Sequence, residues 1–383
     1  MAAVTLMSMR NMSTQQKMDQ VVRLKNDCDT LRNHILVERN KILDSCLTDM
    51  GARAPPIGNL RIKSRQVFRG HMGKIYTCKL IHDDCYVLSV GQDGYVLVWD
   101  AYTSAKVDAL PLEASWVLSA GASRTDNLIA TGGFDTAVTV YKLFELDDLT
   151  DGSPNRRVRS IRSRTPQCIF RGHSGLVSDI EFVSGSTLVS SSADLTLRTW
   201  DLHSGETIQE YRDHLGDINC VRLCPKDNNI VATGAADSMI KVWDLRTRPG
   251  ASVQTFVASF EVNQLDFFPD GNALCSAGED GVVRMFDRRS DGQVGQYGGG
   301  VDGGGSGVLG PPAVTAVKFT PSGRLICAGR RDGSWGSYDI MTGQWTSHLA
   351  HTQEITSIQV GDDGRRLYTS CWDSTIRSWE PVT

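Results

Sequence analysis

Polar and apolar positions recur with a fixed spacing over most of this chain. From residue 93 onward, seven pairs in which an aspartate is followed six positions later by an aromatic residue recur at intervals of 41 to 59 residues. They are Asp93/Trp99, Asp135/Tyr141, Asp194/Trp200, Asp237/Trp243, Asp280/Phe286, Asp332/Tyr338 and Asp373/Trp379. Successive aspartates lie 42, 59, 43, 43, 52 and 41 residues apart, and a period of about 40 to 45 residues ending in Trp-Asp is typical of one four-stranded propeller blade. The pattern predicts an all-β fold in which residues 61–383 form a seven-bladed β-propeller of WD repeats.

The upstream half of the repeat supplies a histidine and a hydroxyl group. Four repeats carry a histidine 21 to 23 residues before the aspartate, and six carry Ser or Thr four residues before it. Because imidazole, hydroxyl, carboxylate and indole groups can donate and accept in series, they are expected to form a buried structural network within a blade. The predicted networks are His71, Ser89, Asp93 and Trp99; His173, Ser190, Asp194 and Trp200; His214, Thr233, Asp237 and Trp243; and His351, Thr369, Asp373 and Trp379. The second, fifth and sixth repeats lack the histidine, so their networks should be incomplete.

An amphipathic helix is predicted ahead of the repeats. Residues 12–50 contain no Gly or Pro, and their apolar positions follow heptad steps of 3, 4, 3, 4 and 7. This seam consists of Val21, Leu24, Cys28, Leu31, Ile35 and Ile42. A lone helix of this kind is marginal in water and leaves its apolar stripe exposed, so a second surface must cover it. Packing onto the propeller and a coiled coil with another chain are both open, and the linker 51–60, with two Gly and two Pro, favours the N-terminal coiled coil.

Three further segments have predicted roles. Residues 61–69 should form the outer strand of the seventh blade and close the ring, which removes an open sheet edge. Residues 145–165 and 291–310 are expected to be loop insertions. The first changes from acidic to basic and is expected to be solvated, with the sharper hypothesis, testable by mass spectrometry, that Ser160 is phosphorylated. The Gly-rich stretch 298–310 within the second should be a flexible tether.

Composition narrows the class of function. The net charge of -4 and pI near 6.1 give no global field for nucleic acid. Ten cysteines without a Cys-x-x-Cys pair argue against zinc and disulfides and for a reducing cytosol. No apolar run reaches roughly 20 residues and no signal-peptide or lipidation pattern occurs, so membrane attachment is expected only through lipidated partners. Since no nucleophile with its base and no metal cluster is apparent, we expect a binding protein without a cofactor and not an enzyme.

The repeats also indicate which side chains gather at one mouth of the ring. The third and fifth residues after the Gly-His, and the residue before the repeat aspartate, should lie on loops entering the inner strands. The predicted set is Lys74, Tyr76, Trp116, Leu118, Phe134, Leu176, Asp217, Asn219, Glu261, Asn263, Glu279 and Trp372. Its aromatic and aliphatic members should form one apolar patch, with the acidic members across the mouth. Clustered exposed aromatics beside charge of one sign indicate a protein interface.

The order of these features resembles a known family. A heptad helix and a Pro/Gly linker precede seven repeats containing Arg69-Gly70-His71, Lys74-Ile75-Tyr76, Ser115-Trp116-Val117, Gly132-Gly133-Phe134-Asp135 and Ser370-Cys371-Trp372-Asp373. From about residue 15 to 380 the chain looks like the β subunit of a heterotrimeric G protein. The resemblance implies a γ subunit, or a γ-like segment of a regulator, along the helix and a Gα subunit in its GDP form on the narrow face. It also implies effectors bound after release, a role in transmembrane receptor signalling, and a cytoplasmic location at the inner face of the plasma membrane through partners.

The resemblance can be followed position by position. Lys74, Tyr76, Trp116, Asp217, Asn263 and Trp372 match the residue types with which family members bind Gα. Leu118, Phe134, Glu261 and Glu279 keep the chemistry but change the size, whereas Leu176 and Asn219 are larger departures that put affinity for a standard Gα in doubt. Leu97 and Lys106 match a side contact to the Gα amino-terminal helix. A generic propeller scaffold, such as a ligase adaptor, is the alternative, and co-purification of a small helical γ-like chain would separate the two.

Overall fold

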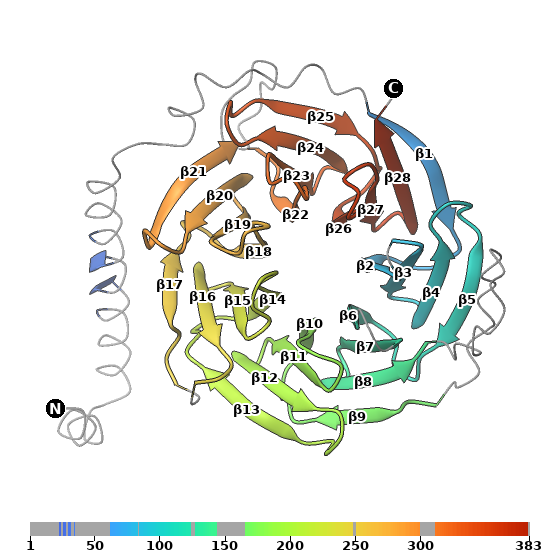
Figure 1. Ribbon diagram of the computed structural model, residues 1–383, viewed down its shortest axis with the longest axis horizontal. Helices are drawn as coiled ribbons and strands as arrows, with labels where there is room; N and C mark the ends of the chain where they lie inside the picture. The colour runs from blue at the N-terminus through green and yellow to red at the C-terminus, as the bar shows by residue number, and fades with distance from the viewer. Residues whose placement is uncertain are drawn as a thin grey trace. The chain divides into compact units, whose positions relative to one another are not determined.

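The computed structural model describes residues 62–82, 84–123, 127–143, 165–247, 250–298 and 311–381, together with six residues near the N-terminus (Figure 1). The chain divides into two compact units, Met1–Ser45 and Cys46–Thr383. The described residues of the first unit are all α-helical and are Arg23, Asn26, Asp27, Thr30, Leu31 and His34. Within the described parts of the chain, no helix has the length and apolarity needed to cross a membrane.

The predicted helical seam is only partly visible. Leu31 is helical and its side chain is 63% exposed, as expected for an apolar position that awaits a partner. Thr30 donates a hydrogen bond to the carbonyl of Asn26, one helical turn earlier. The other seam positions lie outside the described residues, as does the linker 51–60. The coiled coil therefore stays a prediction.

The described residues of the second unit form seven four-stranded antiparallel sheets that surround a common axis as blades, which confirms the predicted propeller (Figure 1). Blades one to three comprise β2 (Ile75–Ile81), β3 (Tyr86–Gly91), β4 (Tyr95–Asp100), β5 (Lys106–Pro111); β6 (Val117–Ala122), β7 (Leu128–Gly133), β8 (Ala137–Lys142), β9 (Cys168–Arg171); and β10 (Val177–Phe182), β11 (Thr187–Ser192), β12 (Thr196–Asp201), β13 (Thr207–Arg212). Blades four and five comprise β14 (Ile218–Leu223), β15 (Ile230–Ala235), β16 (Met239–Asp244), β17 (Gln254–Val257); and β18 (Val262–Phe267), β19 (Ala273–Gly278), β20 (Val282–Asp287), β21 (Gly292–Gly298). Blades six and seven comprise β22 (Val314–Phe319), β23 (Leu325–Arg330), β24 (Ser334–Asp339), β25 (Trp345–Leu349); and β26 (Ile355–Val360), β27 (Leu367–Cys371), β28 (Thr375–Pro381), β1 (Ile62–Arg69).

The ring closes between segments from the two ends of the propeller sequence. Strand β1 pairs antiparallel with β28, from Ile62 opposite Pro381 to Arg69 opposite Thr375. This is the arrangement that the sequence predicted for residues 61–69. Phe68 of β1 is buried against Trp99 of blade one, so the closing strand also packs on the neighbouring blade.

The predicted insertion at 291–310 is wrong in its first part. Residues 292–298 form β21, the outer strand of blade five, and Gly298 is its last residue. The three glycines of this strand hid it in the sequence. What holds it is Tyr297, which is 2% exposed and donates a hydrogen bond to the carbonyl of Ile340 in blade six. Residues 299–310 and most of 145–165, including Ser160, lie outside the described residues, and the latter segment falls between β8 and β9 as predicted.

Four blades contain the hydrogen-bonded network expected from the repeat. In blade three, Trp200 Nε1 donates to Ser190 Oγ at 2.8 Å, and the His173 ring lies 2.8 Å from Ser190 Oγ and 2.9 Å from Asp194 Oδ2. The same contacts join the corresponding residues of blades one, four and seven, namely His71, Ser89, Asp93, Trp99; His214, Thr233, Asp237, Trp243; and His351, Thr369, Asp373, Trp379. Because every polar member has a partner, these buried residues stabilise the blades.

These networks give stability a defined pH dependence. Burial raises the pKa of Asp194, but hydrogen bonds from His173, Thr196 and the backbone lower it by more, so the pKa lies below its usual range. A depressed pKa contributes stability that is complete above the unfolded value of about 4 and is lost as the pH falls through the folded value. We expect Asp194→Asn to lower the free energy of unfolding at neutral pH, by on the order of 2 kcal/mol, and by less in acid, as urea titrations at several pH values would measure.

Asp135 of blade two provides the matched control. It has no histidine partner, and desolvation raises its pKa, so its charge costs folding free energy at neutral pH. Asp135→Asn should therefore leave stability unchanged or increase it. A loss at neutral pH as large as that of Asp194→Asn would contradict this account.

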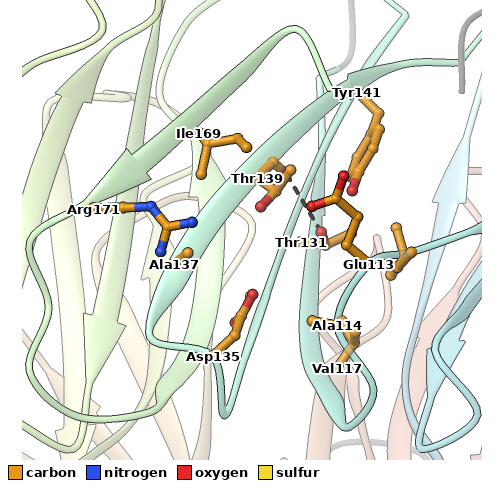
Figure 2. A pocket seen from close by; sticks show the side chains of 12 residues that line it. Glu113, Ala114, Val117, Thr131, Asp135, Ala137, Thr139, Tyr141, Ile169 and Arg171 are labelled. Carbon is orange, nitrogen blue, oxygen red and sulfur yellow. Dashed lines mark hydrogen bonds between the residues drawn. The ribbon is translucent and has the colours of Figure 1, made fainter. Parts of the chain in front are cut away.

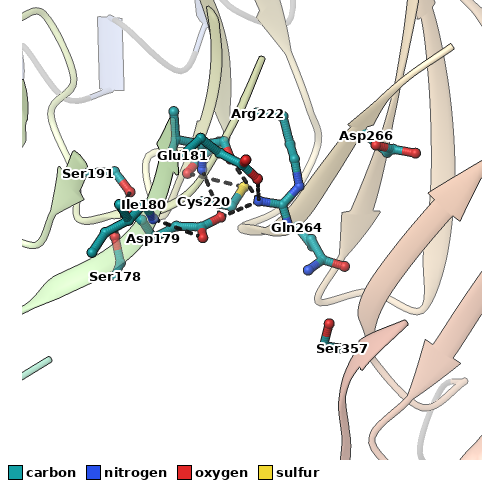
Figure 3. Close-up of polar contacts among 12 residues, drawn as sticks. Ser178, Asp179, Ile180, Glu181, Ser191, Cys220, Arg222, Gln264, Asp266 and Ser357 are labelled. Atoms are coloured by element: carbon teal, nitrogen blue, oxygen red, sulfur yellow. Dashed lines mark hydrogen bonds and ion pairs between the residues drawn. The ribbon is translucent and has the colours of Figure 1, made fainter. Parts of the chain in front are cut away.

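Charged side chains also join the inner strands of different blades. Arg222 of β14 is 8% exposed, makes an ion pair with Asp179 of β10 and lies 3.3 Å from Glu181 Oε1 (Figure 3). Lys79 of β2 reaches the same Glu181 oxygen at 2.7 Å. In blade two, Gly121 occupies the equivalent place in β6, and a Cβ there would lie 2.9 Å from the carbonyl oxygen of Ile180.

Candidate protein-binding face

One end of the ring, here called the mouth face, is built from the same two loop positions in every blade. The backbone N–H of the residue before the repeat aspartate donates to the carbonyl of the residue that immediately precedes the inner strand. The pairs, from blade one to seven, are Gln92/Lys74, Phe134/Trp116, Ala193/Leu176, Ala236/Asp217, Glu279/Glu261, Arg331/Ala313 and Trp372/Glu354. Most of the side chains predicted from sequence therefore lie on adjacent loops at this end.

A β-bulge places the remaining predicted side chains. In all seven blades the pairing of the first two strands shifts at the second residue of the inner strand. The bulged residues are Tyr76, Leu118, Ser178, Asn219, Asn263, Thr315 and Thr356. A bulge leaves one residue unpaired and redirects its side chain. This explains why the fifth residue after the Gly-His is set apart from the regular alternation of the strand.

Five of the seven bulged side chains latch one blade to the next. Asn219 Nδ2 donates to the carbonyl of Val262 at 3.0 Å, and Asn263 Nδ2 donates to that of Val314 at 2.8 Å. Ser178, Thr315 and Thr356 make the equivalent contact to the following blade. Asn219 and Asn263 thus have a structural role that the sequence did not reveal. Among the described residues, Tyr76 and Leu118 do not make this contact, and both are half-buried side chains of the mouth face.

The aromatic half of the mouth face spans blades seven, one and two. Trp116 and Phe134 are 44% and 54% exposed and meet edge to face with ring centroids 5.6 Å apart. Lys74 Nζ lies 3.5 Å from the ring centroid of Trp372, which is half-buried. Leu176 of blade three, also half-buried, continues this side. The structure therefore brings together the aromatic residues that the sequence assigned to one patch.

The position of Trp116 depends on its neighbours. Its φ of 63° is unusual for a bulky residue. Gly133, which faces it, has no space for a side chain, since a Cβ there would lie 2.3 Å from the carbonyl oxygen of Trp116. An outlier of this kind persists when the surrounding structure fixes it, and such outliers concentrate at functional sites.

The acidic half differs from the prediction of a group with one sign of charge. Asp217 and Glu261 are exposed, but Glu279 is paired with Arg331, whose Nη2 donates to Glu279 Oε2 at 3.0 Å. Arg331 Nε also lies 3.7 Å from Glu354 Oε2. Desolvation raises the pKa of Glu354, and the charge of Arg331 opposes this rise. Arg331 and Glu354 occupy the two loop positions that the sequence rule specifies, so the rule, applied to blades six and seven in full, identifies them.

Of the two residues predicted to contact the Gα amino-terminal helix at the side of blade one, only one is accessible. Leu97 is 2% exposed and packs in a core cluster with Phe68 and Trp99, so the prediction that it contacts a partner is wrong. Its alternation in β4 turns it toward the closing strand. Lys106, at the start of β5, is exposed as expected.

Several exposed apolar residues near the mouth face were not predicted. Met72 and Leu215, which directly follow two network histidines, are 96% and 80% exposed, and Phe260 beside Glu261 is 52% exposed. The backbone N–H groups of Met72 and Leu215 donate to the network aspartates, which holds both residues at the loop surface. An apolar residue immediately after a buried histidine is the sequence signal that would identify them.

Comparison with known proteins bears on this arrangement. Residues 17–380 match the family model described as G protein beta WD-40 repeat protein. The chain is 27% identical to the guanine nucleotide-binding protein subunit beta of Saccharomyces cerevisiae, with 93% of this chain and 89% of the relative covered. It is 28% identical to the protein of the same name from Zea mays, with 92% and 93% covered, and 27% identical to subunit beta-1 of Nicotiana tabacum, with 91% and 93% covered.

Proposed function

Since this chain belongs to the G protein beta WD-40 repeat family, we propose that it is the β subunit of a heterotrimeric guanine nucleotide-binding protein and binds Gα·GDP through its mouth face. Release of Gα then frees the same face for effectors. The relatives carry the β-subunit name over nearly their full length, which supports this role. A non-enzymatic scaffold role agrees with the family.

The observation that carries the proposal is the composition of the mouth face. The exposed pair Trp116 and Phe134 offers rigid apolar anchors, and Asp217 and Glu261 offer exposed negative charge on the opposite side. Aromatic anchors surrounded by polar groups are typical of interfaces in which a few residues dominate the affinity. A partner with an apolar residue next to Lys or Arg fits both halves.

The nucleotide state of Gα supplies the switch in this proposal. The switch segments of Gα rearrange when GTP replaces GDP, so the two states present different surfaces to the mouth face. A ligand shifts an equilibrium only through its differential affinity for the two states. We infer that the aromatic half packs against an apolar residue of a switch segment. The acidic half pairs with a Lys or Arg of these segments.

The N-terminal helix is proposed to pair with a γ subunit or with a γ-like segment of a larger regulator. Leu31, helical and exposed, supports this, because an apolar side chain on a helix surface is stabilised by a second helix. If this helical partner carries a lipid, it holds the protein at the cytoplasmic face of the plasma membrane, where we propose that it acts in receptor signalling.

One binding experiment tests the proposal. The full chain is purified with its co-expressed small partner, the partner is identified, and binding to Gα loaded with GDP or with a non-hydrolysable GTP analogue is measured by calorimetry. We expect a helical partner of γ type and at least about tenfold tighter binding of Gα·GDP, which corresponds to about 1.4 kcal/mol. Equal affinity for both nucleotide states, or a propeller that purifies without any helical partner, would favour a generic scaffold.

A further inference from the structure

Blade two lacks the histidine that blades one, three, four and seven carry in their networks. Its sequence Leu112-Glu113 aligns with Gly70-His71 of blade one, so Glu113 stands where the imidazole would be. At two further positions the side chain is smaller than the one in blade three. Ala137 replaces the threonine whose hydroxyl bonds the network aspartate in blade three, and Thr139 replaces Arg198 of that blade.

The missing side chains leave a cavity. In blade three the corresponding space holds the His173 ring, in edge contact with Trp200 at 5.7 Å, and the guanidinium of Arg198 near the same indole. In blade two an open pocket of about 240 Å³ remains (Figure 2). Its walls include Thr131, Asp135 and Tyr141, the remnants of the network, with Glu113 and Arg171 as the other charged residues.

The remnants of the network present polar groups to this pocket. Tyr141 is 3% exposed, and no hydrogen-bond partner of its hydroxyl occurs among the described residues. Glu113 and Asp135 line the same pocket as this hydroxyl, and burial together with their charges raises its pKa (Figure 2). Asp135 lacks the imidazole that its counterparts Asp93 and Asp194 contact. A ligand that supplies hydrogen-bond donors can therefore make the contact to the Asp135 carboxylate that the imidazole makes to Asp93 and Asp194.

The charge of the lining decides the sign of the ligand. Among the described residues that line the pocket, Arg171 alone opposes Glu113 and Asp135, which leaves one net negative charge and disfavours an anion. Arg171 comes from β9 and has no ion pair with another described residue, although its charge lowers the pKa of Asp135 against the larger effect of desolvation. The pocket therefore offers two carboxylates and hydroxyl acceptors in place of one imidazole.

The pocket is continuous with the exposed aromatic pair. A second, shallower hollow is lined by Trp116 and Phe134 and shares Glu113, Ala114 and Asp135 with the first. A cation that enters past an indole face gains cation–π as well as carboxylate contacts. Trp116, Phe134 and the carboxylates thus form one surface.

We propose that the blade-two pocket binds a protonated arginine or lysine side chain of a protein that places an apolar neighbour on Trp116 and Phe134. The partner's cation takes the position of the absent histidine and completes the network between chains. The pocket acts as a specificity site, and its chemistry is the same whichever protein supplies the basic residue. This inference is independent of the proposed Gα interface, since the pocket would accept such a basic residue from any protein. A peptide alone can therefore test it.

A peptide titration of the full chain with its helical partner tests this inference. The probe is acetyl-Leu-Arg-amide, and the matched control is acetyl-Leu-citrulline-amide, which has the same shape without the charge. Binding is followed by NMR through the indole N–H of Trp116, assigned with Trp116→Phe. We expect saturable binding of the arginine peptide in the millimolar range and at least about tenfold weaker binding of the citrulline peptide.

Variants of the pocket separate it from the rest of the mouth face. Asp135→Asn should weaken the arginine peptide about tenfold, and Glu113→His should abolish binding by restoring the imidazole from within. Arg171→Ala should tighten binding, since it removes the competing charge. Equal affinity for the two peptides, no saturable shift, or wild-type binding by both Asp135→Asn and Glu113→His would overturn the proposal. Because none of these outcomes involves Gα, a failed Gα titration and a failed pocket are told apart.

Discussion

Arg222→Met is expected to lower the free energy of unfolding by about 3–5 kcal/mol, the largest single-residue effect that we predict. The guanidinium pairs with Asp179, contacts Glu181 and donates to the carbonyl of Val221 at 2.7 Å (Figure 3). Its removal leaves two carboxylates of another blade in a poorly solvated place. Burial raises the pKa of Glu181, but the charges of Lys79 and Arg222 lower it by more, so this carboxylate is ionised in the folded protein.

Urea denaturation of Arg222→Met would measure the loss. The double variant Asp179→Asn, Arg222→Met removes the uncompensated charge, leaves Glu181 paired with Lys79, and should recover part of the stability. Arg212→Met is the matched control, because Arg212 is an exposed residue paired with Glu210 and its loss should leave the unfolding curve nearly unchanged. If Arg222→Met unfolds at the wild-type urea concentration, the inter-blade ion pairs contribute nothing.

Trp116→Ala and Trp372→Ala are each expected to weaken Gα·GDP binding by about 2 kcal/mol or more, which is roughly a 30-fold loss of affinity. Trp116 presents its indole at the mouth face next to Phe134, and Trp372 is held under the ammonium group of Lys74. Both lie on the aromatic half, where truncation removes an anchor and leaves the partner's apolar residue without contact. Calorimetric titration with Gα·GDP measures the change.

Folding controls keep this prediction interpretable. Trp116 is 44% exposed, so its truncation should leave thermal unfolding nearly unchanged. Ile208→Ala is a matched surface change, because Ile208 is 51% exposed on the outer strand β13 and should bind Gα·GDP as the wild type does. Unchanged affinity in both tryptophan variants would contradict the assignment of the mouth face as the Gα-binding surface.

The sequence was sufficient where the pattern is local. The recurrence of Asp135/Tyr141 and its six counterparts gave the number of blades, because each repeat is one sheet whose turns and alternation are encoded within about 40 residues. The four networks followed from the same spacing, since their members belong to one blade. The sequence pattern hid β21, because its three glycines resemble a tether and only packing of Tyr297 on the next blade holds it.

The candidate site also has features that the local sequence predicts and features that depend on other blades. Spacing from the Gly-His and the aspartate placed Trp116 and Phe134 at one end of the ring, as the hydrogen bond between their backbones shows. It did not show that Asn219 latches onto the next blade or that Arg331 neutralises Glu279. Both facts depend on residues of another blade.

By itself the sequence determined the repeat, the family and the residues that face the mouth, since these depend on period and order along the chain. Only the tertiary structure decided that Leu97 is buried and that blade two holds a pocket lined by Glu113 and Asp135 beside Trp116. The physical reason is that accessibility and pairing depend on which blades lie side by side and on the volume of their facing side chains. Contacts between strands far apart in sequence set both quantities, and no local spacing encodes them.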